Sequence, residues 1–511
     1  MPDPTSNVEK QVPESRVNIH SFEYGRPENM SKLRELVFVL VITCAQLFTQ
    51  IGVGQGIAPI EIIGDYFGDT DPGVKAWYVA GYALTVGTFI LAAGRLGDMF
   101  GHKLMFVIGF TWFCLWSLLA GIANYVEHSS VFFSFCRGMQ GIGPAMLLPN
   151  GLAILGRTYH SPGKRKHLVF ALFGASAPSG FLIGCLFSGM LAQLSFWAWG
   201  FYIMAICCAG LAVLSIFVIP PDGEGLSDVR KNEGFDYLGA FFGISGLILV
   251  NCAWNQSPIE GWEKAYVYVL LIVGTACLVA FFIVELKVAK HPLIPLAAFN
   301  GVIGRTLICI ACGWATFGIW IFFLWQFWLN LQHKTPLTCS AQFVPAAISG
   351  FAASLFTGLV VGRMSTSIVM MISMVAFCVA VVLLAPMPIH QTYWAESFVS
   401  IIIGCWGMDI SFPAATILLS SAVPKEHQGI AASLIATVVN YSISIGLGIA
   451  GTVQRYTVPE ASTEVGNIQI QLRSYKSAFY TAIGLSGLGV LVAFYSVIVD
   501  LITRKKKQAS N

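Results

Sequence analysis

Two ionisable residues stand inside long apolar stretches of the sequence. Arg137 lies three residues before Gln140, and Asp409 lies within the run from Trp406 to Pro413. A charge at the centre of a bilayer costs about 3 kcal/mol or more, so both side chains are expected to face a polar interior and to serve a function. The alternatives are an arginine that reaches the membrane surface and an aspartate that caps a helix broken at Pro413.

A third group of reactive side chains lies in the charged segment from Gly94 to Lys103, between two apolar runs. The segment holds Gly94, Asp98, Gly101 and Lys103 at the spacing G-x3-D-x2-G-x-[RK]. Glycine allows helix ends to approach closely and permits positive φ, and basic residues are typical of cytoplasmic loops. We expect a tight cytoplasmic turn in which Asp98 makes polar contacts, although a plain helical hairpin would also fit.

Uncharged polar and aromatic side chains inside the apolar runs are candidate substrate contacts. Their amides, hydroxyls and rings could bind a polar or cationic solute, although aromatic residues near helix ends more often anchor a helix at the membrane interface. The candidates are Gln46, Gln50, Gln55, Tyr82, Asn150, Asn251, Trp314, Gln326 and Asn440.

The composition indicates that membrane helices must position these residues. Hydrophobic residues make up 56% of the 511 residues and charged residues only 11%, against about a quarter in soluble domains. The alternating pattern of a membrane β-barrel is absent, so helices are expected. The net charge of +3 gives no reason to expect nucleic-acid binding.

A membrane-crossing helix needs about 20 apolar residues, and fourteen such runs are found. The runs form two sets of six with an additional pair between them, which predicts an all-α membrane protein with two six-helix bundles. They cover residues 36–60, 75–96, 104–125, 131–155, 168–193, 197–219, 237–255, 266–285, 303–328, 338–361, 368–386, 393–420, 428–452 and 477–500.

The remaining boundaries follow from these spans. We predict a disordered tail (1–35), an N-terminal bundle (36–219), a linker with two extra helices (220–302), a C-terminal bundle (303–502) and a basic tail (503–511). With the N-terminus inside, the interior loops and tail hold most of the Lys and Arg residues, which predicts that both termini are cytoplasmic.

The charged segment and the run Arg137–Ala145 together resemble signatures of the major facilitator superfamily, and the extra pair of helices resembles its fourteen-span drug:proton antiporter branch. Residues 253–256, 406–416 and 440–452 are similar to a fungal group that includes an aminotriazole- and boron-resistance exporter and a low-affinity ammonium transporter. The resemblance implies a plasma-membrane transporter with a substrate site near the bilayer midplane. It also implies that Asp98 locks the two halves in one state and that Arg137 is linked to proton coupling.

Three positions depart from the family pattern: Met99 and His102 stand where arginine is usual, and Gln50 stands where the drug exporters carry a carboxylate. Proton-linked efflux of a small xenobiotic or borate-like solute is the first hypothesis. Low-affinity ammonium transport, motivated by Gln50, is the second. A membrane receptor that does not transport is the third.

The sequence lacks the motifs of nucleotide binding, metal binding and nucleophilic catalysis. The sequence has no G-x4-G-K-[ST] nucleotide loop, no metal-ligand spacing and no nucleophile–base constellation, so we expect no cofactor and no enzymatic activity. The 13 cysteines are read as small apolar fillers. The expected partners are a small molecule or ion, protons and the lipid bilayer, and the protein is expected to be a monomer.

Overall fold

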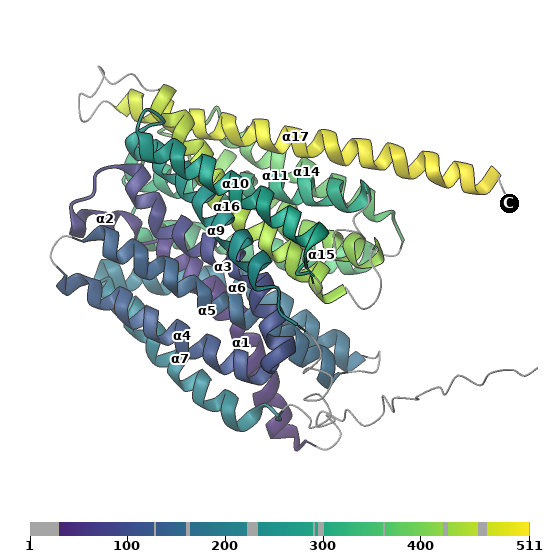
Figure 1. The fold of residues 1–511 in the computed structure, drawn as a ribbon. Helices are drawn as coiled ribbons and strands as arrows, with labels where there is room; N and C mark the ends of the chain where they lie inside the picture. Colours follow the sequence, from purple (N-terminus) through teal and green to yellow (C-terminus); the bar gives the residue numbers. More distant parts are fainter. Residues whose placement is uncertain are drawn as a thin grey trace, which may run out of the picture.

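The computed structural model describes residues 30–126, 129–159, 164–221, 234–289, 292–294, 301–360, 363–422, 428–457 and 468–509. Most of the predicted N-terminal tail therefore lies outside the described residues, as does the loop at 222–233. The described part is helical throughout its long segments, and Figure 1 shows that these helices run roughly alongside one another.

The described residues of the N-terminal half form seven α-helices. Their bounds are α1 (Lys32–Ile57), α2 (Ile60–Phe67), α3 (Pro72–Phe100), α4 (His102–Ile122), α5 (Ser130–Thr158), α6 (Lys164–Leu194) and α7 (Ala198–Val218). Only α2 is too short to cross a membrane, so this half has the six spans that the sequence predicts.

The inserted pair and the C-terminal half follow. Their helices are α9 (Tyr237–Glu260), α10 (Ala265–Lys287), α11 (Gly301–Gln326), α12 (Pro336–Gln342), α13 (Val344–Val360), α14 (Thr366–Leu384), α15 (Glu396–Ala422), α16 (Gln428–Thr457) and α17 (Ile468–Ala509). A π-helical segment, Phe327–Leu331, ends α11, and α12 and α13 together form one span.

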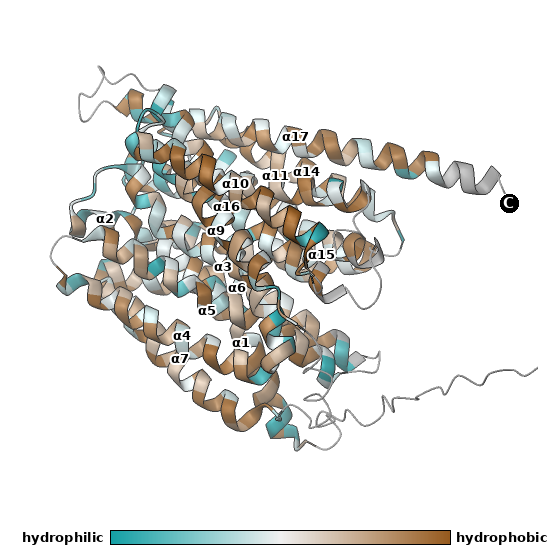
Figure 2. Cartoon of the chain, in the orientation of Figure 1, coloured by the Kyte–Doolittle hydropathy of each residue, from teal (hydrophilic) through white to brown (hydrophobic). Residues whose placement is uncertain are grey.

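Thirteen helices in the described part are long and apolar enough to cross a membrane. The fourteenth predicted span is α5, which has 29 residues but lower hydropathy, because Arg137, Gln140 and several glycines lie within it. Figure 2 shows hydrophobic residues along the outer faces of the helices and hydrophilic residues gathered towards the two ends of the bundle.

We call the end of the bundle where α1 begins and α17 ends the terminus end, and the opposite end the far end (Figure 1, right and left). At the far end, one apolar core unites both halves, with Phe181 of α6 against Trp325 of α11 and Phe343 between α12 and α13. At the terminus end there are two cores. One is formed by the N-terminal half and contains Phe38, and the other, formed mainly by the C-terminal half, contains Ile303.

The two halves therefore share one apolar core at the far end and have separate cores at the terminus end, where they still meet through α3 and α16. Because a dry packed core holds helices in fixed relative positions, opening the far end requires the shared core to be separated.

The inserted helix α9 packs against its partner α10 and is hydrogen-bonded to α16 of the C-terminal half. The hydroxyl of Tyr441 donates to the Leu247 carbonyl (2.9 Å), and Ser444 Oγ donates to Asn251 Oδ1 (2.8 Å). Near the far end, Arg455 Nη1 donates to the Pro258 carbonyl (3.1 Å). These bonds join α9 to α16 along most of its length.

One sequence expectation needs correction here. The segment Gly94–Phe100 is not a turn: it forms the last turns of α3, and the chain reverses only at Gly101, whose φ is 109°. The backbone groups of charged residues can form the i→i−4 hydrogen bonds of a helix, so charge alone does not end α3. The helix ends only at the residue that needs positive φ. Helix α17 also continues to Ala509, through most of the predicted basic tail.

Candidate functional site

Arg137 lies fully buried in the middle of the N-terminal half. Its Nε donates to the Tyr78 carbonyl of α3 (2.9 Å), and its Nη2 donates to the Gly52 carbonyl of α1 (2.6 Å). Its Nη1 donates to the side-chain amide oxygen of Gln140, one turn along α5. The guanidinium therefore joins α1, α3 and α5, and it does not reach the membrane surface.

The charge of Arg137 is stabilised by dipoles and a ring. The guanidinium carbon lies 4.7 Å from the centroid of Tyr82, a distance at which a cation interacts favourably with an aromatic face. No ion pair among the described residues involves Arg137. A buried arginine held in this way is first a structural clamp, and its predicted part in proton coupling stays a proposal.

Asp98 belongs to a polar cluster at the terminus end of the N-terminal half. Its Oδ1 lies 3.3 Å from His102 Nε2 and 3.6 Å from Arg157 Nη2, while His102 Nδ1 lies 2.7 Å from Asn150 Oδ1. All these partners belong to the same half. The expected lock between the halves is therefore not formed by these contacts, which agrees with the divided core at this end.

Besides Asp98 and Gly101, the charged segment has two further candidates, Lys103 and Gly94, which lie in different surroundings. Lys103 Nζ donates to the carbonyls of Ile216 (2.7 Å) and Ile219 (2.6 Å), which ties the start of α4 to the end of α7. Gly94 lies against Pro149 of α5, where an added Cβ would be 3.5 Å from the proline Cβ.

Asp409 occupies the seam between the halves. It is half-buried on α15, and an added Cβ on Gly350 of α13 would meet its Oδ2 at 2.6 Å and the Pro178 Cβ of α6 at 3.6 Å. Helix α15 continues through Pro413, so Asp409 is not the cap of a broken helix. No hydrogen bond or ion pair among the described residues involves its carboxylate. It can therefore bind a proton or a cation without first giving up a partner.

Five of the nine uncharged candidates are buried and engaged in helix packing. Examples are Gln55, whose Nε2 donates to the Gly200 carbonyl (2.9 Å), and Tyr82, whose hydroxyl donates to the Thr49 carbonyl (2.8 Å). Asn150, Asn251 and Gln326 are likewise bonded to neighbouring side chains. These five residues stabilise the framework in this conformation.

The other four candidates, Gln46, Gln50, Trp314 and Asn440, are half-buried. Trp314 Nε1 donates to Ser411 Oγ (3.1 Å), two residues from Asp409 on α15. These four side chains therefore keep some exposed surface, and Trp314 is bonded to a residue of α15 that lies two positions from Asp409 in the sequence.

A polar network that sequence reasoning missed joins the halves at the far end. Lys75, only 6% exposed, makes a 2.5 Å ion pair with Glu61, and the Asn330 amide donates to Glu61 Oε1 (3.3 Å) and to the Tyr475 hydroxyl (3.1 Å). The sequence gives only a weak signal for this network, because its residues lie at the ends of spans, where polar side chains are common. The available hint in the sequence was an acidic residue, Glu61, at the start of the short helix α2 and a basic residue, Lys75, at the start of α3.

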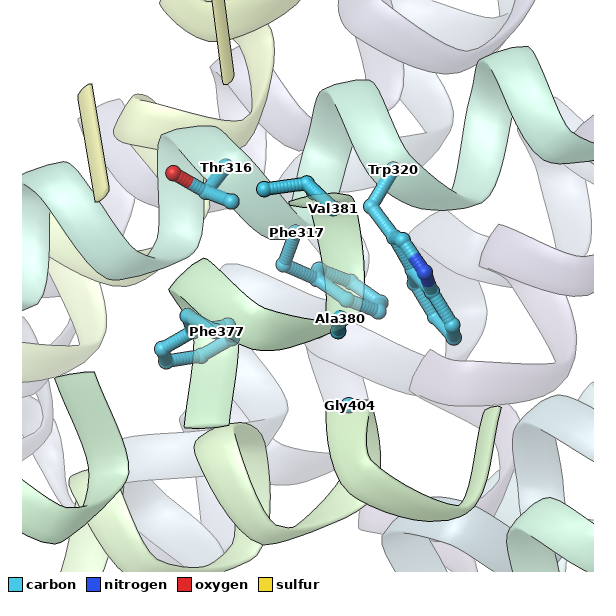
Figure 3. Close-up of a pocket in the computed structure, with 7 residues that line it drawn as sticks. All are labelled: Thr316, Phe317, Trp320, Phe377, Ala380, Val381 and Gly404. Carbon is cyan, nitrogen blue, oxygen red and sulfur yellow. The ribbon is translucent and has the colours of Figure 1, made fainter. Parts of the chain in front are cut away.

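A small void in the C-terminal half does not serve as a binding site. Figure 3 shows its lining, with Phe317 and Trp320 of α11, Phe377 of α14 and Gly404 of α15. The void is too narrow to admit a water molecule. Trp320 also donates from Nε1 to Ser400 Oγ (2.8 Å), so its ring is fixed by the framework.

Comparisons with known proteins agree with this architecture. The family model described as Major Facilitator Superfamily matches residues 39–449 and 308–510. The low affinity ammonium transporter of Saccharomyces cerevisiae is 52% identical over 96% of this chain and 93% of its own, and the efflux pump terJ of Aspergillus terreus is 45% identical over 95% and 92%. A crystal structure of a POT family transporter with a thioalcohol-conjugated peptide covers 94% of this chain and 98% of its own, with a TM-score of 0.65 at 14% identity.

Proposed function

Because the chain belongs to the Major Facilitator Superfamily, we propose that this transporter couples proton movement to the export of a small xenobiotic or borate-like solute. Efflux is supported by the similarity to an efflux pump of Aspergillus terreus over nearly the whole chain. The observation that carries the proton linkage is the position of Asp409, between α13 and α6 at the seam.

A carboxylate at this position can couple a proton to a conformational change for a physical reason. The ionised carboxylate has a high free energy in a low-dielectric seam and a lower one where water reaches it. The protonation of Asp409 and the packing of the two halves therefore influence each other. A proton bound by Asp409 would allow α6 and α13 to pack around a neutral group. Loss of the proton would favour the state in which water enters the seam.

The direction of opening follows from the expected orientation. With both termini in the cytoplasm, the divided terminus end faces inward and the sealed far end faces outward. The described conformation is then the inward-facing state, which is the state that loads an exported solute. Plasma-membrane location and a monomeric state belong to the same proposal.

The other candidates take supporting roles. Half-buried Gln46, Gln50, Trp314 and Asn440 would contact the solute. Arg137 would hold α1, α3 and α5 as one rigid unit during the movement, so that the halves rock against each other instead of deforming.

The decisive experiment is flux into liposomes with and without a pH gradient, using aminotriazole, boric acid and ammonium as cargoes. Asp409→Asn is expected to keep transport down a solute gradient but to lose its acceleration by a pH gradient. Glu396→Gln, which removes another carboxylate of α15, is the matched control and should respond as the wild type does. A pH-dependent flux that survives Asp409→Asn would refute the assigned role.

Low-affinity ammonium transport is the second candidate function. It is favoured by the uncharged Gln50 on α1 and by the 52% identical yeast relative. In the same liposomes it predicts ammonium flux without a pH gradient and no flux of aminotriazole or boric acid. No ammonium flux into the liposomes, together with measurable flux of aminotriazole or boric acid, would exclude it.

A further inference from the structure

Two of the four tryptophans in α11 and its π-helical end bury an indole N–H that has no acceptor among the described residues. They are Trp325 and Trp328, whose side chains are inaccessible to solvent. The other two are paired, because Trp314 Nε1 and Trp320 Nε1 donate to serine hydroxyls of α15 at 3.1 and 2.8 Å. A buried donor without an acceptor raises the free energy of the state that contains it, so each unpaired indole calls for an explanation.

The two unpaired indoles have different neighbours. The ring of Trp325 lies 6.4 Å, between centroids, from Phe181 of α6, which belongs to the N-terminal half, and 5.3 Å from Phe343. The ring of Trp328 lies 6.5 Å from Tyr393 and 5.4 Å from Lys334 Nζ, and both of these residues belong to its own half. Trp325 therefore lies at the contact between the halves, whereas Trp328 packs against the C-terminal half.

Gln326, the next residue along α11, supplies a second unpaired donor. Its side chain is 1% exposed, and its Oε1 accepts from Asn330 Nδ2 (2.6 Å), but its Nε2 has no partner in the described part of the chain. The same Asn330 amide donates to Glu61 of the N-terminal half (3.3 Å). Directly after Gln326 the chain becomes π-helical over Phe327–Leu331, a rare form that is frequent at functional sites. Two unpaired donors therefore lie side by side in the sequence, where the halves meet at the far end.

We propose that the Trp325 indole and the Gln326 amide form an exit site that selects solutes carrying hydrogen-bond acceptors. The inference rests on the proposed function, in which an exported solute leaves between the halves at the far end. As the shared core separates there, an acceptor atom of the solute pairs with donors that the sealed state leaves unpaired, which lowers the free energy of passage.

The selectivity follows from the chemistry of the solutes. The ring nitrogens of aminotriazole and the oxygens of boric acid have lone pairs that accept hydrogen bonds. Ammonium has only N–H donors, as a lysine ammonium does, so it leaves both protein donors unpaired. A site built to hydrogen-bond one solute discriminates against another that lacks the matching group. Trp325 and Gln326 therefore favour the acceptor-bearing solutes over ammonium.

The test measures flux through the whole protein in liposomes, down a solute gradient and without a pH gradient. KM is determined for aminotriazole and for boric acid. Trp325→Phe keeps an aromatic ring but removes the N–H, and it should raise KM about fivefold, the equivalent of one neutral hydrogen bond. Any ammonium flux should be no lower than in the wild type. Trp328→Phe makes the same chemical change at the indole that faces its own half, and it should keep the wild-type KM.

A second variant tests the amide. Gln326→Met should raise KM about fivefold above the value for Asn330→Ala. Both variants lose the hydrogen bond between these two residues, but only Gln326→Met also loses the unpaired Nε2 donor. If Trp325→Phe does not fold, this comparison decides.

The outcomes separate this inference from the proposed function. A wild-type KM in Trp325→Phe, or an equal rise in Trp325→Phe and Trp328→Phe, overturns the exit site and leaves proton-linked export intact. The expected KM shifts in a protein whose flux ignores a pH gradient support the exit site and overturn the proton linkage. A wild type that carries ammonium but neither aminotriazole nor boric acid overturns the exit site together with the proposed cargo.

Discussion

The side-chain amide of Asn330, in the C-terminal half, lies 3.3 Å from the carboxylate of Glu61, in the N-terminal half. It is a direct polar bond across the sealed far end, and Glu61 in turn neutralises the buried Lys75. Because both halves must separate here for the far end to open, this bond stabilises the sealed state relative to the open one.

Asn330→Ala should therefore increase the population open at the far end. Loss of a hydrogen bond to a charged group costs about 1.5 kcal/mol, or roughly a tenfold change in the equilibrium. Native Cys185 and Cys339, buried at the same seam, report on it through their rate of alkylation by a maleimide. Gln332→Ala, which removes a bond to the Ile389 carbonyl within one half, should leave that rate unchanged. Equal rates in Asn330→Ala and the wild type would contradict the prediction.

Substitution by alanine should destabilise the protein at Gly97 but not at Gly94, one turn away on α3. A Cβ on Gly97 would collide with Asn150 Oδ1 and lie 2.7 Å from His102 Nδ1, whereas one on Gly94 has no neighbour closer than 3.5 Å. Gly97→Ala is expected to cost about 1–3 kcal/mol through overpacking and to lower the melting temperature, while Gly94→Ala leaves it near the wild-type value. Adding Asn150→Ala to Gly97→Ala should restore part of the loss. A Gly97→Ala protein with wild-type stability would show that the cluster is more loosely packed than described.

Arg137→Lys should be strongly destabilising although it conserves the charge. A lysine ammonium cannot reach the Tyr78 and Gly52 carbonyls and Gln140 together, and it stays buried. The expected loss is about 3 kcal/mol, typical of a buried charge deprived of its partners. Thermal unfolding in detergent measures it, with Arg473→Lys on the exposed surface as the control. Similar melting temperatures for the two variants would show that the three-way clamp contributes little.

The inserted helix α9 should move with the C-terminal half during transport. Ser257→Cys with Thr452→Cys would join α9 to α16, since the two hydroxyl oxygens are 2.5 Å apart. Gly73→Cys with Ile259→Cys would join α9 to α3, where an added Cβ on Gly73 lies 2.9 Å from Ile259 Cγ1. Oxidation should leave flux intact in the first pair and stop it in the second, with recovery after reduction. Inhibition by the α9–α16 disulfide would mean that the insert slides along both halves.

The sequence predicted the spans well because a bilayer imposes one simple requirement, a long apolar run with internally bonded backbone. It failed at Gly94–Phe100, where the charged residues predict a turn although α3 continues through them. Near a helix end such residues reach water, so polarity there does not signal the end of the helix. Only Gly101, with its positive φ, marks the reversal.

The candidate site was harder to predict, because the sequence of a helix that is apolar on all sides does not show which of its faces points to the protein interior. Gln50 and Gln55 look equivalent in the sequence, yet Gln55 is buried and bonded to the Gly200 carbonyl while Gln50 stays half-buried. Which polar side chain faces a neighbour depends on the rotation of each helix, and contacts between distant segments set that rotation. Asn330 was missed for the same reason, since its partner lies 269 residues away.

The low hydropathy of α5 bears on how the chain enters the membrane during synthesis. A helix with an arginine among its apolar residues costs about 3 kcal/mol more to enter lipid alone. The carbonyls that receive Arg137, on Gly52 and Tyr78, belong to α1 and α3, which are made before α5. Insertion of α5 is thus favourable only after its acceptors are in place. The order of synthesis and the order of assembly in the N-terminal half must therefore coincide, and a permuted chain that began at α5 would lack the partners for its charge.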